Sequence, residues 1–97
     1  MQIKRLRNLH DLNFIHNDLK LENILVGHQD SHKIYLIDFG LAEHYLDSDN
    51  KHLKKVNTSS FSGNLQFASL NSLRGMSHSR RDDIESVFYI LAYLINN

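Results

Sequence analysis

Two short apolar runs, together with the polar residues beside them, constrain the fold of this chain more than any other feature. Ile24–Val26 and Ile34–Ile37 are partly β-branched, and the stretch Gly27–Lys33 between them is polar. This pattern predicts a β-hairpin. In such a hairpin, the residue before the first strand and the residue after the second lie at the same open end, about 5 Å apart. Asn23 and Asp38 occupy these positions, so we expect their side chains to converge.

The polar residues near this open end suit phosphoryl transfer. Asn23 and Asp38 offer oxygen ligands of the kind that Mg²⁺ prefers, and Mg²⁺ completes its shell with phosphate and water. Asp18 lies on the incoming loop, and Lys20 follows it with a cationic side chain. Phosphoryl transfer depends mainly on positioning and charge neutralisation, so one carboxylate, one cation and two metal ligands form a sufficient set. The alternative is a chance polar loop beside a hairpin.

The order and spacing of these side chains resemble a known catalytic loop. The catalytic loop and metal-binding triplet of eukaryotic protein kinases show the same pattern as His16, Asp18, Lys20, Asn23 and Asp38. The resemblance implies that Asp18 is the catalytic base and that Lys20 contacts the γ-phosphate. Asn23 and Asp38 are then the metal ligands. His16 would hold the loop by packing and hydrogen bonding and would not act as a base.

The same resemblance implies the cofactors and the substrate. ATP and Mg²⁺ would be required, with Leu25 and Ile37 forming the apolar floor under the adenine. The phosphate acceptor would be a serine or threonine of a protein. The stretch from Asp47 to Ser60 is polar and charged, and by its position it would be the activation segment.

The second half of the chain narrows the resemblance to the casein kinase 1 family. Ser69–Asn71 reads Ser-Leu-Asn, close to the Ser-Ile-Asn that this family has in place of the common Ala-Pro-Glu. Ser79–Ser86 resembles the entry to the central helix of the large lobe. There, Asp83 would hold the backbone of the catalytic loop. The absence of proline from the whole chain agrees with this family.

Four residues depart from the family pattern. Asn17 replaces an arginine that pairs with a phosphate on the activation segment, and an amide cannot make that bidentate charged contact. Asn64 replaces a threonine that hydrogen-bonds to the catalytic Asp and Lys, although Asn can still donate. Gln66 replaces an arginine that helps to bind primed substrates. Phe88 replaces a glycine and would require a local change in packing.

Composition excludes several classes of function. Lys plus Arg equals Asp plus Glu at 11 each, so no basic field indicates nucleic acid. Cysteine is absent, which removes disulfides and thiolate metal sites. The longest apolar run, Val87–Leu94 with Ile95, is shorter than the roughly 20 residues that span a membrane. We therefore expect a soluble intracellular protein, cytoplasmic or nuclear, without nucleic-acid or membrane partners.

Two helices complete the predicted fold. Ile3, Leu6, Leu9 and Leu12 recur at helical spacing, and from Asp83 to Ile95 the chain is apolar nearly all round a helical wheel. The fold class is α+β: a protein-kinase-like, mostly helical C-lobe fragment with a catalytic-loop β-hairpin. Residues 1–97 would form one partial kinase domain comprising the end of helix E, the catalytic loop, the metal-binding hairpin, the activation segment and helix F.

Parts of a working kinase are not expected in this chain. No Gly-x-Gly-x-x-Gly occurs, so the N-lobe is absent, and the helices that would follow helix F are also missing. Without these parts, we expect a fragment that is inactive alone. We also expect it to be poorly soluble, because the apolar surface of its central helix is not covered. One alternative is a fragment of a small-molecule kinase of the choline or aminoglycoside type. The other is a non-catalytic pseudokinase or interaction fragment.

Overall fold

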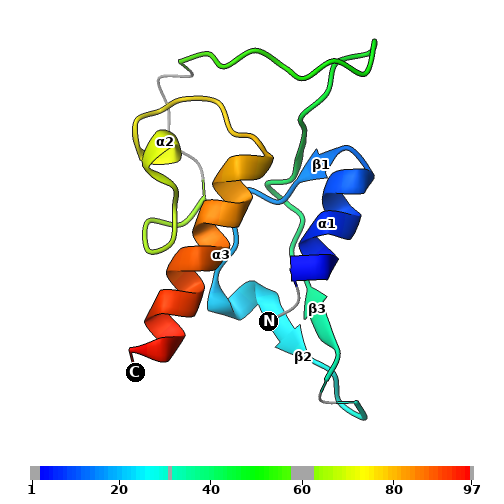
Figure 1. Ribbon diagram of the computed structural model, residues 1–97, viewed down its shortest axis with the longest axis vertical. Helices are drawn as coiled ribbons and strands as arrows, with labels where there is room; N and C mark the ends of the chain where they lie inside the picture. The colour runs from blue at the N-terminus through cyan, green and yellow to red at the C-terminus, as the bar shows by residue number, and fades with distance from the viewer. Residues whose placement is uncertain (1–2, 31, 58–62, 97) are drawn as a thin grey trace.

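The computed structural model describes residues 3–30, 32–57 and 63–96 (Figure 1). Its elements in chain order are α1 (Ile3–Asp11), β1 (Phe14–Ile15), the 3-10 turn η1 (Leu21–Asn23), β2 (Ile24–Val26), β3 (Ile34–Leu36), β4 (Glu43–His44), α2 (Leu70–Leu73) and α3 (Arg80–Ile95). This mixture of helices and strands agrees with the predicted α+β class. The predicted activation segment is described only up to residue 57, because residues 58–62 lie outside the described ranges.

Helix α1 follows the amphipathic pattern only in part. Leu6 is buried and Leu9 partly buried, whereas Lys4 and Arg7 face solvent. Leu12 was expected on the same apolar face, but the helix ends at Asp11 and Leu12 is 68% exposed. The chain leaves the helix through Asn13, which has a left-handed φ of 73° and donates its N–H to the His10 carbonyl at 2.9 Å. Asn tolerates this conformation better than most residues, so the turn ends the helix at little cost.

The predicted hairpin is confirmed. β2 and β3 pair antiparallel, with Ile24 opposite Leu36 and Val26 opposite Ile34. Beyond the strands, the N–H of Ile37 donates to the Asn23 carbonyl at 3.0 Å, which extends the ladder by one pair. The open end of the hairpin therefore lies at Asn23, where the metal ligands were expected.

A second two-stranded ribbon joins the segment before Asp18 to the residues that follow Asp38–Gly40. β1 pairs antiparallel with β4, with Phe14 opposite His44 and Ile15 opposite Glu43. The rings of Phe14 and His44 stack with their centroids 4.1 Å apart. The ribbon brings the start of the catalytic loop and the exit from the hairpin side by side.

Helix α3 crosses the middle of the molecule, with α1 on one side and α2 on the other (Figure 1). Ile90 is fully buried and Val87 is 5% exposed. They join a core with Leu6, Leu19 and Phe67. The helix therefore ties α1, the catalytic loop and the segment before α2 together.

Helix α3 is only partly covered within the described residues. Its exposed apolar side chains are Ile84, Phe88, Tyr89, Tyr93, Leu94 and Ile95. Ile84, Phe88 and Ile95 lie along one stripe of the helix, here called its outer face. Phe88 is 59% exposed, so the local change in packing expected from sequence does not involve the described core. Among the described helices, none is long and apolar enough to cross a membrane.

Candidate active site

Asp18 is held on its loop by several neighbours. Its side chain is largely buried, and its Oδ1 accepts a hydrogen bond from Asn64 Nδ2 at 3.2 Å. Its Oδ2 lies 4.0 Å from Lys20 Nζ. Asn23 Nδ2 donates to the Asp18 carbonyl at 2.8 Å. The carboxylate thus faces one cation and two amide donors, since Asn23 Nδ2 also lies 3.5 Å from its Oδ2.

Asn23 and Asp38 lie at the open end of the hairpin, in different environments. Asn23 is 4% exposed, and its Nδ2 points to Asp18. Among the hydrogen bonds between described residues, none uses the Asn23 side-chain oxygen. Asp38 is exposed and has a left-handed φ of 60°. Its Oδ1 accepts from the Gly40 N–H at 3.3 Å. Both side chains therefore retain oxygen atoms that can ligate a hard cation.

The two residues expected under the adenine share one face of the hairpin. Leu25 lies opposite Tyr35, and Ile37 is two residues further along the second strand. Side chains two apart on a strand point to the same side, so Leu25 and Ile37 are diagonal neighbours. Leu25 is 45% exposed and Ile37 is partly buried. The face is apolar and accessible.

His16 links the catalytic loop to the end of the hairpin. The ring is fully buried, and its Nδ1 accepts from the Asp18 N–H at 3.1 Å. The other nitrogen, Nε2, must then carry the proton and donate to the Ile37 carbonyl at 3.0 Å. Phe39 packs edge-on against the ring, with centroids 5.3 Å apart. Both ring nitrogens therefore form hydrogen bonds with the backbone.

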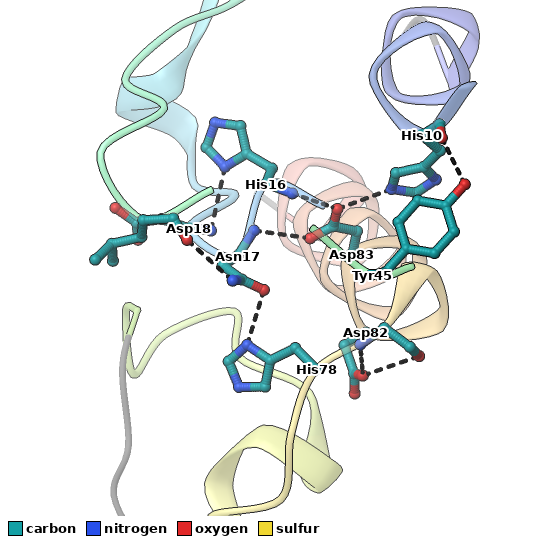
Figure 2. A network of polar contacts seen from close by, with 10 residues as sticks. His10, His16, Asn17, Asp18, Tyr45, His78, Asp82 and Asp83 are labelled. Atoms are coloured by element: carbon teal, nitrogen blue, oxygen red, sulfur yellow. Dashed lines mark hydrogen bonds and ion pairs between the residues drawn. The ribbon is translucent and has the colours of Figure 1, made fainter. Parts of the chain in front are cut away.

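Asp83, on α3, receives three hydrogen bonds (Figure 2). Its Oδ2 accepts from the His16 N–H at 2.7 Å and from His10 Nε2 at 2.8 Å. Its Oδ1 accepts from the Asn17 N–H at 3.0 Å. The carboxylate is 2% exposed, and a carboxylate taken out of water needs such donors. Two of these contacts hold the backbone of His16 and Asn17 against α3.

Sequence reasoning missed two residues of this network. His10 donates to Asp83 from α1, and the hydroxyl of Tyr45 donates to the His10 carbonyl at 2.5 Å. His10 lies four residues after the buried Leu6, so the helical periodicity placed it on the inner face. A polar side chain at such a position was the available signal, because buried polar groups need partners.

Asp82, next to Asp83, fixes the segment that carries the Ser-Leu-Asn motif. Its Oδ2 accepts from the Ser79 N–H at 2.8 Å, which caps the start of α3. Its Oδ1 accepts from the Ser69 hydroxyl at 2.5 Å, and Ser69 in turn caps α2 by accepting from the Ser72 N–H at 3.0 Å. The two aspartates at the start of α3 therefore hold both polypeptide segments that border the site.

Comparison with known proteins agrees with this geometry. The chain matches the family described as "Fungal protein kinase" over residues 2–95. It is also similar to a probable casein kinase I homolog of Encephalitozoon cuniculi, with 44% identity over 86 residues. That alignment covers 89% of this chain and 26% of the relative, so the chain spans about a quarter of the length of this relative.

Proposed function

Because the chain belongs to the protein kinase family and is casein kinase 1-like, we propose that its site serves ATP-dependent phosphorylation of serine or threonine residues in proteins. The observation that supports this most is the environment of Asp18. Its carboxylate is held by Asn64 and lies 4.0 Å from Lys20, beside the open end of the hairpin. This arrangement suits a base that must face both a hydroxyl group and a phosphate.

The proposed reaction assigns one role to each side chain. Asp18 orients the acceptor hydroxyl and takes its proton as the oxygen attacks the γ-phosphorus. The bond between the γ-phosphorus and the bridging oxygen breaks, and ADP leaves. Lys20 balances negative charge on the γ-phosphate, while Leu25 and Ile37 support the adenine. Buried His16 and Asp83 hold the loop so that these groups keep their positions.

The residues present fit a magnesium ion. Asn23 presents a carboxamide oxygen because its nitrogen is turned to Asp18, and Asp38 presents a carboxylate at the solvent-facing end of the hairpin. Hard oxygen ligands of this kind suit Mg²⁺. When bound, the ion would neutralise phosphate charge. Asn23 and Asp38 would hold it.

We further propose that residues 1–97 belong to the large lobe of a longer kinase and are inactive by themselves. The chain spans 26% of its relative, and no Gly-x-Gly-x-x-Gly occurs in its sequence. A kinase needs such a loop to cover the phosphates and a strand lysine to hold them. The whole protein would therefore be the active form, with protein substrates.

The test is phosphate transfer from radiolabelled ATP by the full-length protein, followed by phosphoamino-acid analysis. We expect labelled serine or threonine. Asp18→Asn should reduce kcat about 10²- to 10⁴-fold, the usual contribution of a general base. Asp11→Asn is the matched control, because Asp11 is an exposed residue at the end of α1, outside the catalytic loop and the activation segment, and the activity of this variant should equal that of the wild type.

Other outcomes would replace this proposal. Label on choline or an aminoglycoside, with none on protein, would make the chain part of a small-molecule kinase. Absence of transfer, together with unchanged binding of a protein partner by Asp18→Asn, would make it a non-catalytic interaction module. The family match favours the protein kinase.

A further inference from the structure

Asn17 connects four segments of the molecule. Its N–H donates to Asp83 on α3, and its Nδ2 donates to the Leu41 carbonyl at 2.9 Å, just after the metal-binding triplet. Its Oδ1 lies 2.8 Å from Nδ1 of His78. Its backbone has a left-handed φ of 72°, and a Cβ added at Gly63 would lie 2.7 Å from its carbonyl oxygen. Asn17 therefore occupies a junction that tolerates little displacement.

The direction of each hydrogen bond follows from its partners. A backbone carbonyl only accepts, so the Asn17 amide nitrogen must face Leu41 and its oxygen must face His78. His78 Nδ1 then carries a proton. In the neutral ring, Nε2 is an acceptor, and the Ser72 hydroxyl lies 2.7 Å away to donate to it. The bonds run from Ser72 through His78 and Asn17 to Leu41, all in one direction, and such chains strengthen one another.

We propose that His78 is a positioning residue for the phosphoryl-transfer site, acting with Asn17 as a hydrogen-bond relay. The proposal rests on the proposed function, since it concerns the same site. At one end, the relay holds Leu41, three residues after the metal ligand Asp38. At the other end, it holds Ser72 of α2, which is 4% exposed. Figure 2 shows Asn17 between His78 and Asp83, with contacts to both.

The relay explains how this chain orders its loops with Asn at position 17. An arginine there would need an anion for its charge, and an amide does not. The Asn17 amide is instead satisfied by Leu41 and His78, 24 and 61 residues away in the sequence. The metal side and the α2 side of the site are thereby joined to the catalytic loop through hydrogen bonds of the Asn17 side chain and the His78 ring.

Two conservative substitutions of His78 separate its hydrogen bond to Asn17 from its hydrogen bond to Ser72. The side-chain amide of Asn can replace Nδ1, so His78→Asn keeps the bond to Asn17 and loses the bond to Ser72. The amide of Gln reaches the position of Nε2, so His78→Gln keeps Ser72 and loses Asn17. His78→Ala loses both. Since each variant retains a polar or small side chain at a partly buried position, the pair separates the two contacts from general damage.

Amide hydrogen exchange in the full-length protein reports positioning without requiring activity. The readouts are the Ala42 N–H, which donates to Phe39, and the Ser72 N–H, which donates to Ser69. Loss of one neutral hydrogen bond should accelerate local exchange about three- to tenfold. We expect His78→Gln to accelerate exchange at Ala42, His78→Asn at Ser72, and His78→Ala at both. The Ile37 N–H, outside the relay, should not change.

Catalysis by the full-length protein gives the second readout. His78→Asn should raise KM for the protein substrate about three- to tenfold and leave kcat within about twofold, because it releases only α2. His78→Gln should lower kcat by a similar factor. Equal acceleration of exchange at Ile37, or no acceleration at Ala42 and Ser72, would overturn the relay. If the wild type transfers no phosphate, the proposed function fails, whereas the exchange pattern still decides whether His78 positions these segments.

Discussion

The two faces of helix α3 show how differently polar and apolar groups are satisfied in this chain. On the inner face, Asp82, Asp83 and Ser86 are buried, and every buried side-chain polar atom in the described part of the chain has a partner. On the outer face, Phe88 and Ile95 are 59% and 81% exposed. Within the described residues, the buried polar groups of the helix all have partners, whereas part of its apolar surface is left uncovered.

The difference follows from the physical character of the two interactions. A hydrogen bond is short and directional, so the few segments next to Asp83 suffice to saturate its carboxylate. The stabilisation from burying apolar surface is proportional to the area buried, so covering a long helix requires many side chains packed against it. The 97 residues of this chain supply them to only one face of α3. The catalytic loop can therefore be correctly anchored on a helix that is only half covered.

The largest expected effect comes from removing the anchor on the inner face. Asp83→Ala leaves His10 and two backbone N–H groups without their acceptor, and should lower the free energy of unfolding by about 3–5 kcal/mol. Glu85→Ala, on the same helix, loses an acceptor for Leu70 and Tyr89 near the surface, and should cost about 0.5–1.5 kcal/mol. Urea unfolding measures both. Equal costs would contradict the special role of the buried carboxylate.

A matched pair of apolar truncations compares a covered position of α3 with an uncovered one. Ile90 is fully buried, and Leu94, one turn later on the same side of the helix, is 49% exposed. Ile90→Ala should cost about 2–5 kcal/mol, because it removes a buried side chain and leaves a cavity. Leu94→Ala should cost less than about 1.5 kcal/mol, since only about half of its side chain is buried. A shift of the same size in the urea midpoint would show that the C-terminal end of α3 is packed in solution.

Much of this arrangement could be predicted from local patterns. The β-branched runs predicted the hairpin, and helical periodicity predicted α1 and α3. The resemblance to a kinase family drew attention to Asp18 and Asp83, whose roles stay predictions. Each of these signals depends on residue type and spacing over a short stretch of chain. The exposed apolar face of α3 was also expected, because a helix that is apolar nearly all round needs protein on every side.

What could not be predicted are the contacts between distant segments. His10 meets Asp83 across 73 residues, and His78 meets Asn17 across 61. For neither histidine does the periodicity of the sequence indicate which distant residue it contacts. The pairing of β1 with β4 was missed for a related reason, because two-residue strands are too short to show alternation. The end of α1 before Leu12 depends on the left-handed Asn13, which periodicity does not detect.

Phe88→Ser tests the outer face with a smaller effect on stability. Since Phe88 is mostly exposed, its replacement should change the free energy of unfolding by no more than about 0.5 kcal/mol. It should also reduce self-association, because it divides an exposed apolar patch. Light scattering at increasing concentration measures association. Phe67→Ser, at a core position that is 2% exposed, is the destabilising control. Unchanged association would show that Phe88 does not belong to the surface through which the chain self-associates.

The smallest expected effect is the pH dependence at Tyr89, where an exposed part of α3 carries its own polar contact. The Tyr89 hydroxyl donates to Glu85 at 2.7 Å, and this bond, with some burial and the nearby negative charge, raises the pKa of Tyr89 above its usual 10.0. A raised pKa in the folded state means that the stabilisation is complete below about pH 10 and is lost as the pH rises through the folded value. Glu85→Gln should lower the Tyr89 pKa toward 10.0, as followed by the NMR shift of its ring carbon. An unchanged titration would show that this exposed bond is screened by water, in contrast to the bonds of Asp83 on the inner face.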